Sequence, residues 1–134
     1  MSISIATENP LQVVTREAGT DVTNRRFVKE ATTGIVSRCS VTGETAVGVA
    51  NADAVAGDEV GVKRGGDIIV EAGALISAGA EVMTDTTGRP VTWTDGSGYF
   101  KLGVLTNNSS AGAAGDLVSV QMYFQPIDDA VDLT

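Results

Sequence analysis

Residues 56–62 read Ala-Gly-Asp-Glu-Val-Gly-Val, and residues 114–120 read Ala-Gly-Asp-Leu-Val-Ser-Val. In both stretches a Gly-Asp pair suited to a tight turn precedes valines at every second position, which is the spacing of a half-buried strand. A strand-like Gly-Val stretch comes before each, at residues 48–51 and 103–107. The sequence therefore predicts one unit twice: a strand, a loop, an Ala-Gly-Asp turn and a returning strand.

The aspartates of these turns could take part in chemistry, but a structural role is the simpler interpretation. Glycine accepts backbone angles that a Cβ would resist, and aspartate can bond back to its own turn. We therefore assign Gly57, Asp58, Gly115 and Asp116 to turn formation. A shorter stretch, Ala78–Val82, is a weak echo of the same pattern.

Other parts of the chain also favour an all-β fold. Residues 59–63 and 118–124 alternate apolar residues with polar or small ones, as half-buried strands do. Ile68–Val70 is a continuous apolar run, which suits a strand that is covered on both faces. No segment shows the 3.6-residue period of an amphipathic helix. The prediction is an all-β fold, a small β-barrel or β-tulip-like domain.

The chain length of 134 residues suits a single domain. Residues 1–24 are polar and show no sustained period, so we expect an extended N-terminal arm. Residues 25–124 carry the β pattern and the turns, and they form the predicted barrel-like domain. Residues 125–134 begin beside a proline and are acidic, so we expect a short C-terminal tail.

Composition and charge exclude several classes of protein. The net charge is −8, and an acidic chain argues against a nucleic-acid partner because phosphate binding depends on Lys and Arg. Apolar residues make up 43% of the chain and aromatic residues only 4%, which predicts a core of small side chains. No apolar run is long enough for a membrane helix, and the N-terminus does not resemble a signal peptide. We expect no membrane partner and synthesis in the cytoplasm.

The residues needed for catalysis or metal binding are scarce. The chain has no histidine, which removes the commonest general base and metal ligand. Cys39 has no base beside it, so we interpret it as a structural thiol. Asp95–Gly98 lacks the further oxygen ligands of a calcium loop, and Lys63–Gly66 lacks the context of a phosphate loop. The sequence predicts no enzyme, no cofactor and no metal.

Some residues instead suggest contacts with a partner. Arg25 and Arg26 lie where arm and domain meet, and they could clamp carboxylates of a partner or remain a solvated pair. Trp93 is flanked by threonines and could anchor an interface or serve as an aromatic residue of the core. The apolar residues of the arm could join a partner's sheet. The candidate interface residues are Ile3, Ile5, Leu11, Val13, Arg25, Arg26 and Trp93.

The order of motifs along residues 25–124 points to a family. The motifs are Arg26–Lys29, Gly34–Val36, Ala46–Val49, Ala54–Val60, Val70–Ala74, Ile76–Ala80, Val82–Asp85, Gly88–Val91, Leu102–Val104 and Ala114–Val118. In order and spacing this series resembles the capsid cement, or head decoration, proteins of tailed bacteriophages. The resemblance implies a compact β-barrel-like subunit on the outer surface of the phage head. It also implies no active-site residues.

The resemblance further implies a partner and a mechanism. Such proteins commonly sit as homotrimers where major capsid proteins meet, and they staple the shell against the pressure of packaged DNA. Two alternatives stay open. A tail or fibre component would share the all-β, acidic character, and a hammerhead-type carrier domain would share the small hairpins. A carrier needs a lysine at a hairpin tip, a setting that neither Lys63 nor Lys101 offers.

Overall fold

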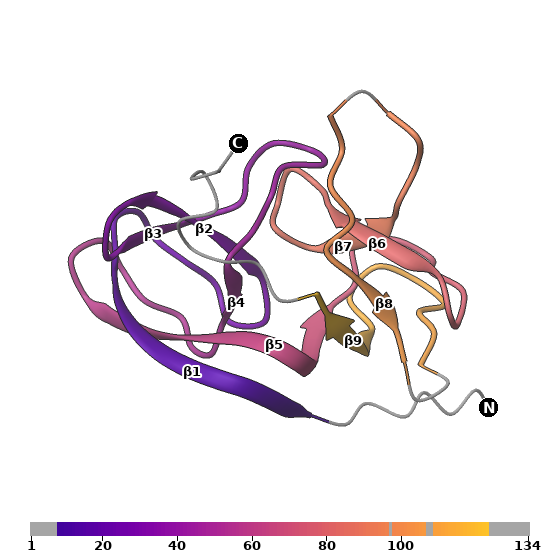
Figure 1. Cartoon of the computed structure of the whole chain (residues 1–134), viewed down its shortest axis with the longest axis horizontal. Coiled ribbons are helices and arrows are strands. Elements are labelled where there is room, and N and C mark those ends of the chain that lie inside the picture. The colour runs from indigo at the N-terminus through magenta and orange to yellow at the C-terminus, as the bar shows by residue number, and fades with distance from the viewer. Residues whose placement is uncertain (1–7, 97, 107–108, 124–134) are drawn as a thin grey trace.

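The computed structural model describes residues 8–96, 98–106 and 109–123 (Figure 1). These residues form nine strands of one sheet and contain no helix, which confirms the prediction of an all-β fold. The finer prediction of a barrel or tulip-like shape stays a prediction. The strands are β1 (Asn9–Ala18), β2 (Phe27–Thr32), β3 (Ile35–Arg38), β4 (Gly48–Ala50), β5 (Glu59–Glu71), β6 (Glu81–Thr84), β7 (Pro90–Thr92), β8 (Gly103–Leu105) and β9 (Leu117–Met122).

The first lobe comprises β1–β4 and the start of β5. Its strands pair in a closed circuit: β1 with β3, β3 with β2, β2 with β4, β4 with β5, and β5 again with β1. The β1–β3 pairing is parallel and the others are antiparallel. The buried core of this lobe consists of small apolar side chains. They are Ala18, Val22, Val28, Val36, Ala50, Val60 and Val62.

The second lobe comprises the rest of β5 together with β6–β9, in the order β5-β9-β8-β6-β7. Its core contains larger side chains, among them Ile68, Ile76 and Leu102. Phe27 also belongs to this core, although it lies on β2 of the first lobe. One aromatic side chain therefore reaches from the first lobe into the second.

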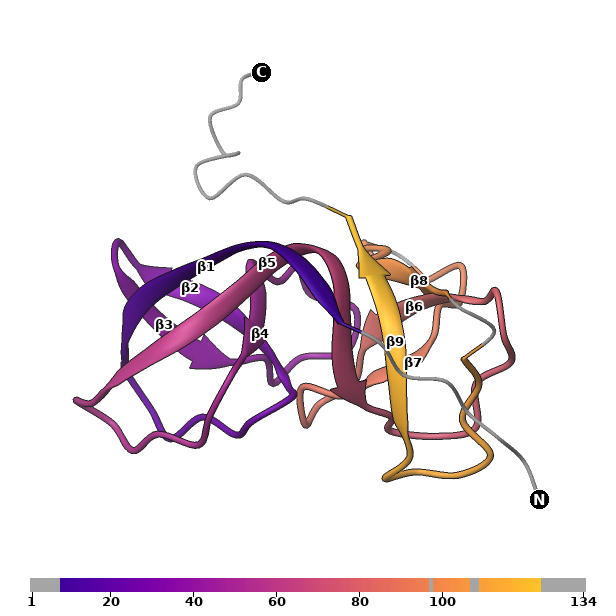
Figure 2. The same cartoon turned by 90° about the horizontal axis from the view of Figure 1, so that it is seen from below.

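Strand β5 is common to both lobes and runs between them (Figure 2). Val60 and Val62 belong to the first core, whereas Ile68 and Val70 belong to the second. Between these pairs, Gly65–Gly66 adopts positive φ angles of 67° and 73°, a conformation that residues with a Cβ rarely take. The glycine pair lets one strand serve two cores.

The two lobes are copies of one strand scheme. Glu17–Gly19 recurs as Glu71–Gly73, and Thr32–Gly34 recurs as Thr86–Gly88, each 54 positions later in the chain. The pairings of β2 with β3 and β4 recur as those of β6 with β7 and β8. The repeat that the sequence reveals at two turns thus extends over most of the described chain.

The predicted turn units occupy equivalent places in the two copies. Gly57 and Gly115 have φ angles of 95° and 97°. The N–H of Ala18 donates to the carbonyl oxygen of Asp58, and the N–H of Ala72 donates to that of Asp116, both at 2.8 Å. The echo at residues 78–82 is not a third copy, because it forms the turn that leads into β6.

Part of the predicted N-terminal arm is a strand of the sheet. Residues 9–18 form β1, which pairs with β5 from Asn9 opposite Asp67 to Glu17 opposite Glu59. The sequence of this segment shows no clean alternation because the outward face of the strand carries apolar residues, among them Leu11. Ile3, Ile5 and the predicted tail at 125–134 lie outside the described residues.

Candidate interaction surface

Strand β1 carries exposed apolar side chains on its outer face. Leu11 is 72% exposed and Val13 is 54% exposed. Val13 pairs with Lys63 of β5, and side chains of paired residues lie on the same face of a sheet. The Lys63 ammonium binds the Glu8 carboxylate at 2.6 Å, and Arg25 is close enough to favour the ionised form of that carboxylate. We call these residues, Glu8, Leu11, Val13, Arg25 and Lys63, the β1 face.

Glu8 ties the beginning of β1 to β5. Partial burial opposes its ionisation, but donors from Lys63 and from the Ile69 N–H, 3.0 Å away, outweigh that effect. The pKa of the Glu8 carboxyl therefore lies below its ordinary value, with a smaller contribution from the positive charge of Arg25. The Glu8–Lys63 pair is neutral as a unit.

One edge of β1 is open. Glu17 pairs with β5 on one side and with β3 on the other, but β3 covers only Glu17 and Ala18. Along residues 9–16, no other described strand lies on the edge turned away from β5. The N–H of Glu17 points to β3 and that of Ala18 points to β5, so by alternation Val13 and Thr15 direct their backbone groups to the open edge. Such an edge can accept a further strand.

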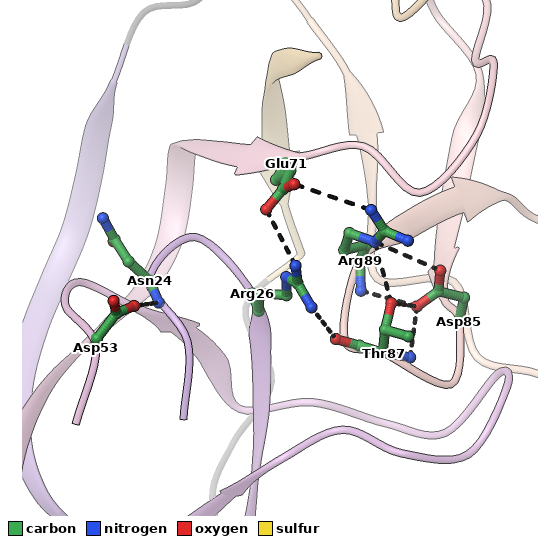
Figure 3. Close-up of polar contacts among 7 residues, drawn as sticks. All are labelled: Asn24, Arg26, Asp53, Glu71, Asp85, Thr87 and Arg89. Atoms are coloured by element: carbon green, nitrogen blue, oxygen red, sulfur yellow. Dashed lines mark hydrogen bonds and ion pairs between the residues drawn. The ribbon is translucent and has the colours of Figure 1, made fainter. Parts of the chain in front are cut away.

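The predicted pair Arg25 and Arg26 is split by the structure. Figure 3 shows Arg26 at the junction of the lobes, where it bonds to Glu71 at 3.3 Å and to the carbonyl oxygen of Thr87 at 3.2 Å. Arg89 approaches the other oxygen of Glu71 at 3.8 Å. Arg26 is thus engaged within the chain, whereas Arg25 is exposed.

Trp93 is half-buried and lies in neither core. Its indole N–H donates to the carbonyl oxygen of Tyr99 at 3.3 Å, and the Lys101 ammonium lies 4.5 Å from its ring centroid. Glu81 binds Lys101 at 3.1 Å and the Tyr123 hydroxyl at 2.9 Å. We call these residues, Glu81, Trp93, Tyr99, Lys101 and Tyr123, the aromatic patch. It belongs to the second lobe and shares no residue with the β1 face.

The bonds within the aromatic patch shift the titration of two groups. The hydrogen bonds from Tyr123 and Lys101 hold the pKa of Glu81 below its ordinary value. Partial burial and the Glu81 carboxylate raise the pKa of Tyr123. Sequence reasoning missed Tyr99, Tyr123 and Glu81. A partial signal was available for Tyr123, because the alternation of residues 118–124 places it opposite the apolar positions, where an outward side chain is expected.

The described residues offer no group of three His, Cys, Asp or Glu side chains that could hold a metal ion. Cys39 is buried, and burial followed by the nearby Glu44 carboxylate raises the pKa of its thiol well above the ordinary range. The alternative of a carrier domain needs a lysine at a hairpin tip. Lys63 instead lies within β5, and Lys101 lies against Trp93. Within the same part of the chain, no helix is long and apolar enough to cross a membrane.

A family model described as phage cement protein matches residues 6–122. The chain belongs to this family. It is therefore a structural protein of a phage virion, as the order of its motifs suggested. The match begins before β1, so the family domain includes the strand that the sequence pattern assigned to the arm.

The cement protein also resembles a solved structure, the head fiber gp8.5 N base of bacteriophage phi29. The two share a TM-score of 0.67 and 22% sequence identity, over 84% of this chain and 93% of the other. At this identity the likeness shows a common fold. No curated protein matches the chain.

Proposed function

We propose that this cement protein binds the outer surface of a phage head and stabilises contacts between subunits of the major capsid protein. The observation that carries the proposal is the open edge of β1 beside the exposed Leu11 and Val13. The family match supports a role in the capsid. The role is adhesive and needs no catalytic group.

The proposed contact combines backbone and apolar interactions. An extended segment of the capsid protein adds to the open edge of β1, and its hydrogen bonds give affinity. Covering an exposed Leu or Val side chain contributes roughly 1.5 to 3 kcal/mol when burial is complete. Many copies on one head make modest contacts hold collectively. Ile3 and Ile5 precede the β1 face in sequence, and we assign them to the same contact.

The proposal includes the assembly and location expected from the sequence. The protein is made in the host cytoplasm and acts on the outside of the head as a homotrimer. Trp93 is assigned to a second contact of the assembled protein, through the aromatic patch. Strand-to-strand contacts and apolar burial both favour assembly.

The test mixes purified protein with expanded, undecorated heads of the cognate phage. We expect the protein to sediment with the heads and to raise their melting temperature. A double variant, Leu11→Ser with Val13→Ser, should lose at least about tenfold in affinity, because about 1.4 kcal/mol corresponds to a factor of ten. Its own melting temperature should stay close to that of the wild type, since both side chains are exposed.

A matched control exists elsewhere on the surface. Leu75 and Val55 are 66% and 57% exposed, so Leu75→Ser with Val55→Ser removes similar apolar area away from the β1 face. This control should bind heads like the wild type. If the wild type fails to bind, the cement function is wrong. If both double variants bind equally well, the β1 face is not the contact.

The fold shared with a head fiber base favours a second candidate, in which the protein is the base of an appendage that projects from the head. Cryo-EM of decorated heads separates the two candidates. Density that ends at the two lobes and bridges capsid subunits supports cement. Density that continues outward from the lobes supports an appendage base.

A further inference from the structure

Arg25 has an unusual backbone conformation. Its φ angle is 65°, and among the described residues it is the one residue other than glycine with a positive φ. This conformation brings the Cβ too close to the following carbonyl oxygen in any L-residue. The fold imposes it, because the Arg25 N–H donates to the carbonyl oxygen of Ala50 at 2.9 Å and its own carbonyl oxygen accepts from the Glu71 N–H at 3.2 Å.

The second lobe provides an internal reference for this position. Gly79, 54 positions after Arg25, has a φ angle of 81°, and nothing lies within 4 Å of where its Cβ would be. The alignment is fixed on both sides, because Val22 and Ile76 form equivalent isolated bridges before this position and Val28 and Val82 lie on equivalent strands after it. The same turn is thus built with glycine in one copy and with arginine in the other.

Contacts within the chain do not account for the arginine. The Arg25 side chain is exposed and forms no ion pair with any described residue. The charge of Arg25 acts on the Glu8 carboxylate, but that carboxylate already accepts from Lys63 and from the Ile69 N–H. The neighbouring Arg26, by contrast, makes two bonds at the lobe junction.

We infer that Arg25 is retained, in a backbone conformation better suited to glycine, because its guanidinium binds a carboxylate of the partner that docks on the β1 face. A guanidinium presents paired donors that match a carboxylate, and such bonds are among the stronger polar contacts. The adjacent Glu8 carboxylate is already bound by Lys63, which leaves the donors of Arg25 available to a partner. In a chain of net charge −8, Arg25 gives an acidic partner surface a favourable point of approach.

The inference takes the identity of the partner from the proposed function. The variant Arg25→Gly tests the role of Arg25 separately from that function. The variant should be at least as stable as the wild type, seen as an equal or higher melting temperature, because glycine suits the backbone. It should nevertheless bind expanded heads roughly tenfold or more weakly, and with a shallower dependence on salt. Arg25→Lys should fall between the two, since it keeps the charge and loses the paired donors.

Lys29→Gln is the control, because it removes one positive charge that belongs to neither the β1 face nor the aromatic patch, and it should leave head binding unchanged. If wild type and Arg25→Gly bind heads equally, the inference about Arg25 is wrong while the cement function stands. If Arg25→Gly is clearly less stable than the wild type, Arg25 has a structural role and the inference is also wrong. Failure of the wild type to bind overturns both.

Discussion

The two lobes share a strand scheme but differ in how each is closed. In the first lobe, the N–H of Glu17 on β1 donates to the carbonyl oxygen of Gly34 at 3.0 Å, next to the start of β3. This bond helps to join the first strand to the third within one copy. The next bond along, from the Gly19 N–H to the carbonyl oxygen of Val36 at 2.8 Å, continues the same contact.

The equivalent groups of the second lobe, Glu71 and Gly88, do not bond to each other. Glu71 donates instead to the carbonyl oxygen of Arg25, and the carbonyl oxygen of Gly88 accepts from the Phe27 N–H at 2.7 Å. The next bond is kept, because the N–H of Gly73 donates to the carbonyl oxygen of Pro90 at 2.9 Å as that of Gly19 donates to Val36. A segment of the first lobe thus replaces one of the two closing bonds of the second lobe. The difference teaches that a duplicated fold can become one unit when part of the closure within one copy is exchanged for a contact between copies.

The largest expected effect comes from Phe27, the largest first-lobe side chain in the second core. Phe27→Ala should lower the free energy of unfolding by about 3 to 5 kcal/mol, because it leaves a cavity in the second core. Both lobes should unfold in one transition, which urea denaturation followed by circular dichroism will measure. Phe100→Ala is the control, since Phe100 is 52% exposed. A loss below about 1 kcal/mol for Phe27→Ala would contradict the crossing role of this ring.

The duplication itself can be tested at a pair of glycines. A Cβ at Gly48 would meet the carbonyl oxygen of Lys63, and a Cβ at Gly103 would meet that of Gln121. Gly48→Ala and Gly103→Ala should each destabilise the protein by about 1 to 3 kcal/mol, because neither backbone can withdraw without disturbing a strand pair. Thermal denaturation of the two variants should give similar shifts. Tolerance at one site with damage at the other would show that the copies are not equivalent there.

The polar contact between the lobes should matter less. Arg26→Met keeps most of the side-chain volume but removes the bonds to Glu71 and Thr87, and we expect a loss of about 1 to 2 kcal/mol. The comparison is Lys101→Met, which breaks the pair with Glu81. Because the Lys101 side chain is 42% exposed, that loss should be no more than about 0.5 kcal/mol. Equal losses in chemical denaturation would argue against a special role for the junction.

The smallest expected effect is a loss of stability at acidic pH. The pKa of Glu44 in the first lobe is lowered: partial burial opposes ionisation, but the N–H groups of Val41 and Ser40 and the Lys29 ammonium outweigh it. Glu8 and Glu81 are also lowered. The unfolded chain therefore binds more protons than the folded one as the pH falls, so stability should decline from about pH 5 to pH 3.

Glutamine variants show which lobe causes this loss of stability at low pH. Glu44→Gln should reduce the acid sensitivity more than Glu81→Gln, because Glu44 holds a partly buried loop and the Glu81 pairs are exposed to solvent. The measurement is the urea midpoint at a series of pH values. A midpoint that stays constant between pH 5 and pH 3 would rule out the proposed linkage.

The parts of the fold that sequence reasoning predicted are those with one buried face and a regular period. Val118, Val120 and Met122 alternate on β9 and are buried as expected. Strand β1 was missed because Leu11 faces outward while Arg16 occupies an inward position, so its pattern gives no clean alternation. The full extent of the duplication was hidden for a related reason: its identical residues are few and scattered between the turns.

The candidate surface was only partly predictable. Leu11, Val13 and Arg25 were singled out separately, but their shared face depends on the pairing of β1 with β5, whose partners are far apart in the sequence. Arg26 could not be distinguished from Arg25 without knowing that Glu71 lies beside it. Trp93 was expected at an interface or in a core, and its half-buried position under Lys101 follows from a loop geometry that no local pattern encodes.

The shared strand β5 also has a mechanical consequence. A force that pulls the two lobes apart acts along a continuous covalent backbone from Glu59 to Glu71. Strands β1 and β9 flank that backbone through eight and six residue pairs, and these ladders would have to shear together rather than open one bond at a time. In the proposed cement role, pressure inside the head would thus load the protein in tension along its most heavily paired strand.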